Sequence, residues 1–264
     1  MTTKNATIKQ AWFAKEETIS IAMSALALSL ALTGGQWGED TFSASEGLKN
    51  IFIAFPVVLF SFVAHEFAHK LAARRNGVHA VFKPAWPMVA FSAVIGIISG
   101  GWVVITAVGT WVLTSLKRIG FKYPFVGAPA QAKIALMGPM VSLLLAIFAK
   151  VFIGIFGESR LLQDLFTFNL WMVFFNMIPF LNFAQRVAPG MRETSAKQIF
   201  PSFDGEFVFA GNPVYYVSFM GFAIVAVLCL LFLPVWVSAI VGVIAGILAW
   251  TAMQREGMVE ILKR

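Results

Sequence analysis

The sequence predicts an all-α membrane protein with about six transmembrane helices and a membrane-associated β-hairpin or re-entrant element between the second and the third. The first observation is composition: the 264 residues are 59% hydrophobic and only 12% charged, and the mean hydropathy is +0.80. A soluble domain carries about 25% charged residues, roughly twice this share. The second is a succession of apolar segments close to the roughly 20 residues that cross a bilayer. We therefore expect one polytopic domain over residues 1–264, embedded in a lipid bilayer.

Six apolar segments define the expected helices. They cover residues 19–33, 51–73, 134–156, 165–180, 214–233 and 235–253. The last two come from one uncharged run, 207–254, which Pro213 and Pro234 divide. The first segment follows three lysines, as a signal peptide would, but no small-residue cleavage site follows it. We therefore expect a retained helix there.

The uncharged segment 84–116 differs in composition from these helices. It contains four glycines and the run "GGWVVITAVGTWVL", which is rich in β-branched residues. Such residues are typical of strands and bends rather than of a single helix. Irregular backbone is tolerated at membrane depth only where protein or a wet cavity surrounds it. We therefore expect paired strands or a re-entrant hairpin, with a seventh helix or a helical hairpin as the alternative.

The basic residues predict the orientation. If both termini are cytoplasmic and six spans alternate, only Lys49, Lys150 and Arg160 of the 20 Lys and Arg residues face outward. Positive charge on the inner side is the bias that orients membrane proteins. The net charge of +7 is scattered along the flanks of apolar runs, so we expect no nucleic-acid partner. The small size and the lack of a targeting signal favour the cell membrane.

An H-E-x-x-H pattern lies inside the second expected helix, in the stretch "VAHEFAHKLAARR". His65 and His69 are four positions apart and share one helix face, so both rings can bind one metal ion. Two imidazoles and one further protein ligand leave the fourth position of a tetrahedral zinc ion open for water. Zinc lowers the pKa of that water towards about 7. Glu66, within the same arc, could accept the proton and later return it to a leaving amine.

The third ligand is not an acidic residue shortly after the motif, because no Asp or Glu occurs from the second histidine to residue 157. The position six residues after the second histidine, where a third could stand, is an arginine. His79 lies beyond the expected end of the helix, and Asp164 lies on the outer side of the predicted topology. The candidates on the inner side are Asp204, in "FPSFDGEF", and its neighbour Glu206.

Three short elements follow the metal motif: "GPM" at 138–140, "NMIP" at 176–179 and "FDG" at 203–205. With H-E-x-x-H on an early membrane helix, this order resembles the site-2 protease family of intramembrane zinc metalloproteases. The resemblance covers roughly residues 50–210, the expected catalytic core. The "GP" and "N-x-x-P" elements are short, so the zinc-binding pattern is the most specific part of the match.

The resemblance implies a role for each site residue and for the unusual segment. The implied residues are His65, His69 and Asp204 as ligands of one zinc ion, Glu66 as the catalytic base, and Asn176 as a substrate-binding residue. The segment 84–116 would be similar to the family's membrane-associated β-element that receives the substrate. One feature departs from the family pattern, because Asp204 comes 28 positions after Asn176 rather than a few. The basic region 182–203 between them is interpreted as an inserted cytoplasmic loop.

The sequence thus predicts an enzyme that hydrolyses peptide bonds within or near transmembrane segments of other membrane proteins. One alternative is a metal-ion transporter that uses the two histidines as a transit site. Transporters usually show repeated halves, and the motif has no second copy in this chain. Another alternative is a relative that binds metal without turnover, against which the presence of Glu66 counts.

Overall fold

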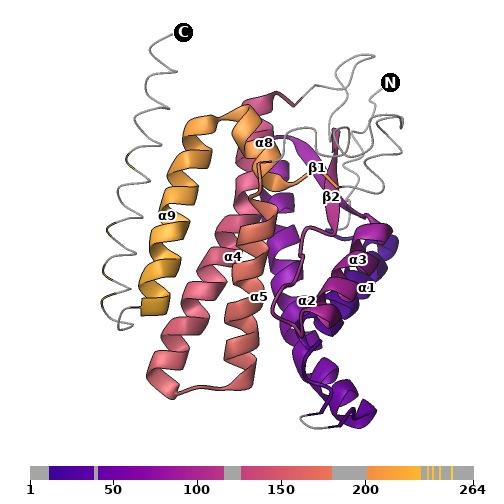
Figure 1. Ribbon diagram of the computed structural model, residues 1–264. Helices are drawn as coiled ribbons and strands as arrows, with labels where there is room; N and C mark the ends of the chain where they lie inside the picture. Colours follow the sequence, from indigo (N-terminus) through magenta and orange to yellow (C-terminus); the bar gives the residue numbers. More distant parts are fainter. Residues whose placement is uncertain are drawn as a thin grey trace.

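The computed structural model describes residues 12–38, 41–115, 126–179 and 201–232, with isolated positions at 237, 240, 244 and 251. Most of these residues are helical, and two strands form one small sheet (Figure 1). Most of the expected span 235–253 and most of the expected loop 182–203 lie outside the described residues, as do both chain ends.

Seven helices are described, and five of them coincide with expected spans. They are α1 (Lys15–Leu32), α2 (Ala44–Arg75), α3 (Trp86–Ile98), α4 (Ala128–Phe156), α5 (Arg160–Asn176), α8 (Asp204–Gly211) and α9 (Pro213–Phe232). By length and composition, α2, α4 and α9 can cross a membrane. Helix α1 begins with three charged residues, and α5 has only 17 residues. A largely helical protein suited to membrane insertion is therefore confirmed, whereas six spans stay a prediction.

Helix α2 carries the H-E-x-x-H pattern and is the longest element. Its 32 residues extend about 48 Å at 1.5 Å per residue, more than the roughly 30 Å of a hydrocarbon core. Ser43 caps its start, accepting a hydrogen bond from the backbone N–H of Glu46 (3.4 Å). Arg74 and Arg75 lie in its last turn, where positive charge is favourable.

The segment 84–116 contains a helix and one strand rather than a complete β-hairpin. Strand β2 (Gly109–Ser115) pairs antiparallel with β1 (Val78–Pro84), which lies almost wholly upstream of the segment. The expectation of strands is therefore confirmed for the end of the segment and wrong for its middle, which forms α3. Gly96 belongs to that helix and lies against Ala31 of α1, where a Cβ atom would clash. This glycine permits close helix packing, which composition alone does not distinguish from a strand bend. At 13 residues, α3 is also shorter than the roughly 20 residues of a seventh span.

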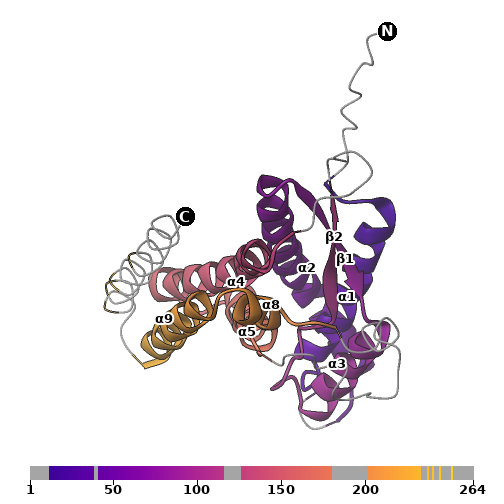
Figure 2. The same cartoon turned by 90° about the horizontal axis from the view of Figure 1, so that it is seen from above.

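Helix α2 lies between two groups of elements. Helices α1 and α3 and the sheet lie on one side of it, and α4, α5, α8 and α9 lie on the other (Figures 1 and 2). It contacts α1 and β1 on the first side and α4 and α5 on the second. One hydrophobic core includes Leu28, Val58 and Phe168, and another includes Ile134 and Phe219. The metal motif thus lies on the helix that both groups share.

Candidate metal centre

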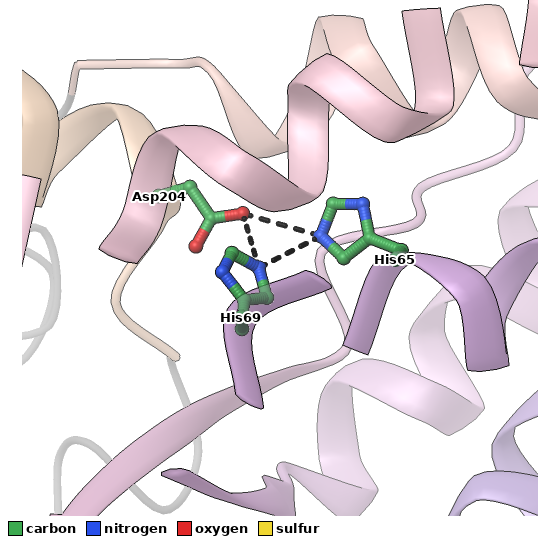
Figure 3. Close-up of side chains that lie close together, drawn as sticks. All are labelled: His65, His69 and Asp204. Carbon is green, nitrogen blue, oxygen red and sulfur yellow. Dashed lines mark hydrogen bonds and ion pairs between the residues drawn. The ribbon is translucent and has the colours of Figure 1, made fainter. Parts of the chain in front are cut away.

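Three buried side chains from distant parts of the chain converge at one point (Figure 3). The Nε2 atoms of His65 and His69 are 3.1 Å apart, and Oδ2 of Asp204 lies 3.3 Å from each of them. None of the three residues is more than 5% exposed. Ligands held about 2.0–2.1 Å from a tetrahedral zinc ion lie roughly 3.3–3.4 Å from one another. The cluster could therefore hold a metal ion.

The second nitrogen of each ring fixes its orientation through α4. Nδ1 of His69 lies 2.8 Å from the carbonyl oxygen of Ile134, which can only accept, so we assign the proton to this nitrogen. Nδ1 of His65 lies 2.9 Å from the hydroxyl of Ser142. In the neutral ring of His69, Nε2 then turns a lone pair towards the carboxylate of Asp204. Acceptors that converge in this way repel one another unless a cation lies among them, and this chemistry fits a metal ion.

Gly138 of α4 lies in close contact with the rings of the two histidines. A Cβ atom at this position would meet the Nε2 atoms of both rings. Glycine therefore leaves free the space in front of the ligand atoms. Gly138 lies between Ile134 and Ser142 at intervals of four residues, so one stripe of α4 carries all three contacts. The element "GPM" lies inside α4 rather than at its start, because the helix begins at Ala128.

Asp204 reaches the histidines because α8 begins against the end of α5. Asp204 is the first residue of α8, a position where negative charge is favourable. A Cβ atom on the next residue, Gly205, would clash with the carbonyl of Met177, the residue that caps α5. Close contact between these two helix ends therefore brings Asp204 to the site, although 28 positions separate it from Asn176. Tyr216 adds to this contact by donating a hydrogen bond to the same carbonyl (2.9 Å).

The environment of Asp204 favours its charged form. Burial alone would raise the pKa of this carboxyl, but the positive charge of His69 and hydrogen bonds from His65 and His69, when these rings are protonated, lower it well below its usual range. The carboxylate is thus ready to act as a ligand without first losing a proton. Its second oxygen, Oδ1, accepts a hydrogen bond from the indole Nε1 of Trp111 in β2 (3.0 Å).

Glu66 follows the first histidine directly, and its side chain is buried. The residue is 6% exposed, yet its carboxylate has neither a hydrogen bond nor an ion pair with another residue of the described chain. A buried carboxylate that no described residue hydrogen-bonds is costly, which makes Glu66 a candidate for a chemical rather than a structural role.

The structure separates the alternative third ligands from Asp204. Among the described residues, only Asp204 joins the two histidines in a group able to bind metal. His79 is buried in β1, Asp164 pairs with Arg160 in α5 (3.6 Å), and Glu206 lies in the first turn of α8. Asn176 ends α5 and donates from Nδ2 to the carbonyl of Met172 (2.9 Å). Its role towards a substrate stays a prediction.

Sequence reasoning missed two residues that hold the ligands. Ser142 could have been found as a hydroxyl inside an apolar helix, four positions after the glycine of "GPM". Trp111 gives a weaker signal, since it looks like any other aromatic residue of a strand. Only the observation that a buried indole N–H needs an acceptor would mark it.

A second buried polar cluster begins at the residue after His69. Nζ of Lys70 lies 2.6 Å from Oε1 of Glu17 in α1 and donates a hydrogen bond to the carbonyl of Ala80 (2.7 Å). The same Oε1 accepts the backbone N–H of Phe82 (2.7 Å). Both charged residues are at most 3% exposed. This ion pair covers the outer edge of β1 and fastens it to α1 and α2.

The edge of β2 differs, because nothing described pairs with it. Ala80 and Phe82 of β1 direct their backbone groups outward, to Lys70 and Glu17. Their antiparallel partners are Leu113 and Trp111. These are therefore non-hydrogen-bonded pairs, in which the backbone N–H and C=O groups of both residues face away from the other strand. The backbone groups of Leu113 and Trp111 accordingly face the outer edge of β2. In the part of the chain that the structure describes, the sheet has no third strand.

Comparison of the chain with protein-family models, with curated proteins and with solved structures found no match. The geometry and chemistry of the site are therefore the main guide to its function.

Proposed function

We propose that this protein is an intramembrane zinc metalloprotease that hydrolyses peptide bonds within or near transmembrane segments of other membrane proteins. One observation carries the proposal: Asp204 meets His65 and His69, which lie on a helix able to cross a membrane, and the buried Glu66 directly follows the first histidine, with no hydrogen bond or ion pair to any described residue. Ionisable residues in a spanning helix are costly and for that reason usually functional. The family resemblance of the sequence supports the same conclusion.

Each residue of the site has a defined task in this proposal. His65, His69 and Asp204 would hold the ion, which when bound supplies a Lewis acid at a position open to water. Glu66 takes the proton from the attacking water and passes it to the leaving amine. Ser142 orients one histidine, and Gly138 keeps the space in front of the ligands clear.

The open edge of β2 supports a peptide substrate. A helical segment hides its carbonyl groups within its own hydrogen bonds, so it must unwind before hydrolysis. An unwound segment can pair with an exposed strand edge through its backbone. Trp111 of this edge contacts the site, because its indole donates to Asp204. The proposal also includes Asn176 as a substrate-binding residue.

The proposal extends to the architecture of the chain. We propose a catalytic core over about 50–210 with an inserted cytoplasmic loop at 182–203. The chain would cross the cell membrane six times, with both termini in the cytoplasm.

The test compares Glu66→Gln with the wild-type protein, purified in detergent or liposomes. We expect the variant to keep its zinc, measured by elemental analysis, and to lose cleavage of transmembrane peptides, since an amide cannot take the proton. Glu46→Gln is the matched control, an exposed glutamate in the first turn of the same helix. Its cleavage rate should equal that of the wild type.

Three other results would contradict the proposal in different ways. Cleavage by Glu66→Gln near the wild-type rate would remove Glu66 from the mechanism. Transport of metal ions into liposomes without cleavage of any peptide would favour the transporter. Stoichiometric zinc with neither activity would indicate a relative that binds metal without turnover.

A further inference from the structure

The two oxygens of the Asp204 carboxylate have separate partners. Oδ2 lies 3.3 Å from each histidine Nε2, whereas Oδ1 accepts the indole N–H of Trp111 at 3.0 Å. Trp111 is 7% exposed, and its ring lies 6.0 Å from that of His69 and 4.6 Å from that of Phe207. The indole is therefore held by packing, and its one donor points at the carboxylate.

We propose that Trp111 is a positioning residue that restricts Asp204 to one metal-facing oxygen and links strand β2 to the metal site. This inference rests on the proposed function, since it assigns a role in assembling that site. An indole can only donate, so it occupies Oδ1 and leaves Oδ2 to the histidines. Without this donor the carboxylate can turn and offer both oxygens, filling the position that a catalytic zinc site keeps open.

The position of Trp111 in the sheet gives this hydrogen bond a second consequence. Its side chain holds Asp204, while its backbone N–H and C=O face the open edge of β2. A peptide paired along this edge would fix the same residue that fixes the carboxylate. Coupling between two sites is reciprocal, so a bound peptide should strengthen metal binding as much as metal strengthens peptide binding.

Zinc affinity of Trp111→Phe tests the proposal, measured by competition with a chelator on the full chain. Phenylalanine keeps an aromatic ring against His69 and Phe207 but has no N–H donor. Loss of a residue that orients a metal ligand typically weakens binding by about 10- to 100-fold, and we expect a loss in this range. Trp171→Phe is the control, because in the described chain the Trp171 indole makes ring contacts and no hydrogen bond. It should bind zinc like the wild type.

A comparison in the background of Asp204→Ala separates positioning from packing. If Trp111 acts through the carboxylate, Trp111→Phe should weaken zinc binding in the wild type and leave the residual affinity of Asp204→Ala unchanged. Equal weakening in both backgrounds would show a packing role and overturn the proposal, as would unchanged affinity in the single variant.

Cobalt spectra provide a readout that does not depend on activity. Four-coordinate Co²⁺ absorbs visible light more strongly than five- or six-coordinate Co²⁺, so Trp111→Phe should show weaker absorption per bound ion. A spectrum identical to that of the wild type would contradict the proposal. Failure of the protease function would instead appear as absent peptide cleavage by a wild-type protein that binds zinc normally, so the two failures are distinguishable.

Discussion

Two neighbouring residues of α2, His69 and Lys70, take part in buried polar clusters that differ in one respect. Lys70 has its polar partners within the protein, the carboxylate of Glu17 and a backbone carbonyl. His69 has a partner for Nδ1, and its Nε2 faces the carboxylate of Asp204 and the Nε2 of His65. A buried group whose partners are all present indicates a structural role. Two imidazole nitrogens and a carboxylate oxygen that converge on one point could hold a metal ion, whereas the ion pair of Lys70 anchors the sheet.

The two edges of the sheet show the same contrast. The edge of β1 is closed by Glu17 and Lys70, while no described strand pairs with the edge of β2, whose Trp111 contacts Asp204. An exposed strand edge invites pairing with any other strand. Closing one edge and leaving the other next to the ligands would direct a peptide to the catalytic side. In the proposed protease, the ion pair and the metal cluster would then be complementary parts of one arrangement.

The largest predicted effect is the loss of bound zinc in Asp204→Asn, which disrupts the metal cluster and leaves the ion pair intact. An amide is a poor substitute for a carboxylate on a divalent ion, so we expect purified protein to lose its stoichiometric zinc. The fold should persist, because the substitution removes a buried negative charge. Elemental analysis measures the zinc, and circular dichroism measures the helix content.

Three variants of the alternative ligands serve as controls for Asp204→Asn. They are His79→Ala, Asp164→Asn and Glu206→Gln, none of which removes a member of the metal-binding group. Each should retain zinc near the wild-type level. Full zinc in Asp204→Asn, together with loss in one of these three, would transfer the third ligand to that residue and leave the protease proposal in place.

The second-largest predicted effect is a loss of protein stability when the Glu17–Lys70 ion pair is broken. Lys70→Met leaves the carboxylate of Glu17 buried without its counter-charge, which typically costs about 3–5 kcal/mol. Unfolding in mixed detergent micelles, followed by circular dichroism, measures this loss. Adding Glu17→Gln should recover much of it, since no unpaired charge then remains. Lys49→Met, an exposed lysine of the same helix, should change stability little, and equal losses in both lysine variants would refute a structural role for the pair.

The sequence predicts the parts of the site that depend on local spacing. His65, Glu66 and His69 follow from helix periodicity within five residues, so no tertiary information is needed. Asp204 is different, because reasoning from the residues leaves Glu206 open beside it and only the family resemblance selects one. Its contact with the histidines depends on Gly205 meeting the end of α5, which no local pattern encodes.

The parts that were missed depend on the packing of separate elements. The role of Trp111 follows from the strand register and from where α8 begins, and both are properties of the folded chain. The helix α3 was missed because glycine serves close helix packing as well as strand bends. Glu17 lies in a charged stretch whose composition is typical of a solvent-exposed first turn of a helix, although the fold buries it against β1.

The smallest effect should come from Ser142→Ala, which removes the partner of His65 Nδ1 while leaving every ligand atom in place. A hydrogen bond of this kind contributes about 0.5–1.5 kcal/mol to stability, and its loss allows the imidazole ring to turn. Zinc affinity should then fall by about 10-fold, the lower end of the range for residues that orient metal ligands.

Ser24→Ala is the matched control for this last substitution. Ser24 is also fully buried in a helix, but its hydroxyl makes no hydrogen bond within the described chain. Removing an unsatisfied hydroxyl should leave stability unchanged or raise it slightly, with no change in zinc affinity. Chelator competition on both variants decides the matter. If the two serine variants bind zinc equally well, the hydroxyl of Ser142 does not orient His65, and the ring must be held by the contacts of α2 and α4 alone.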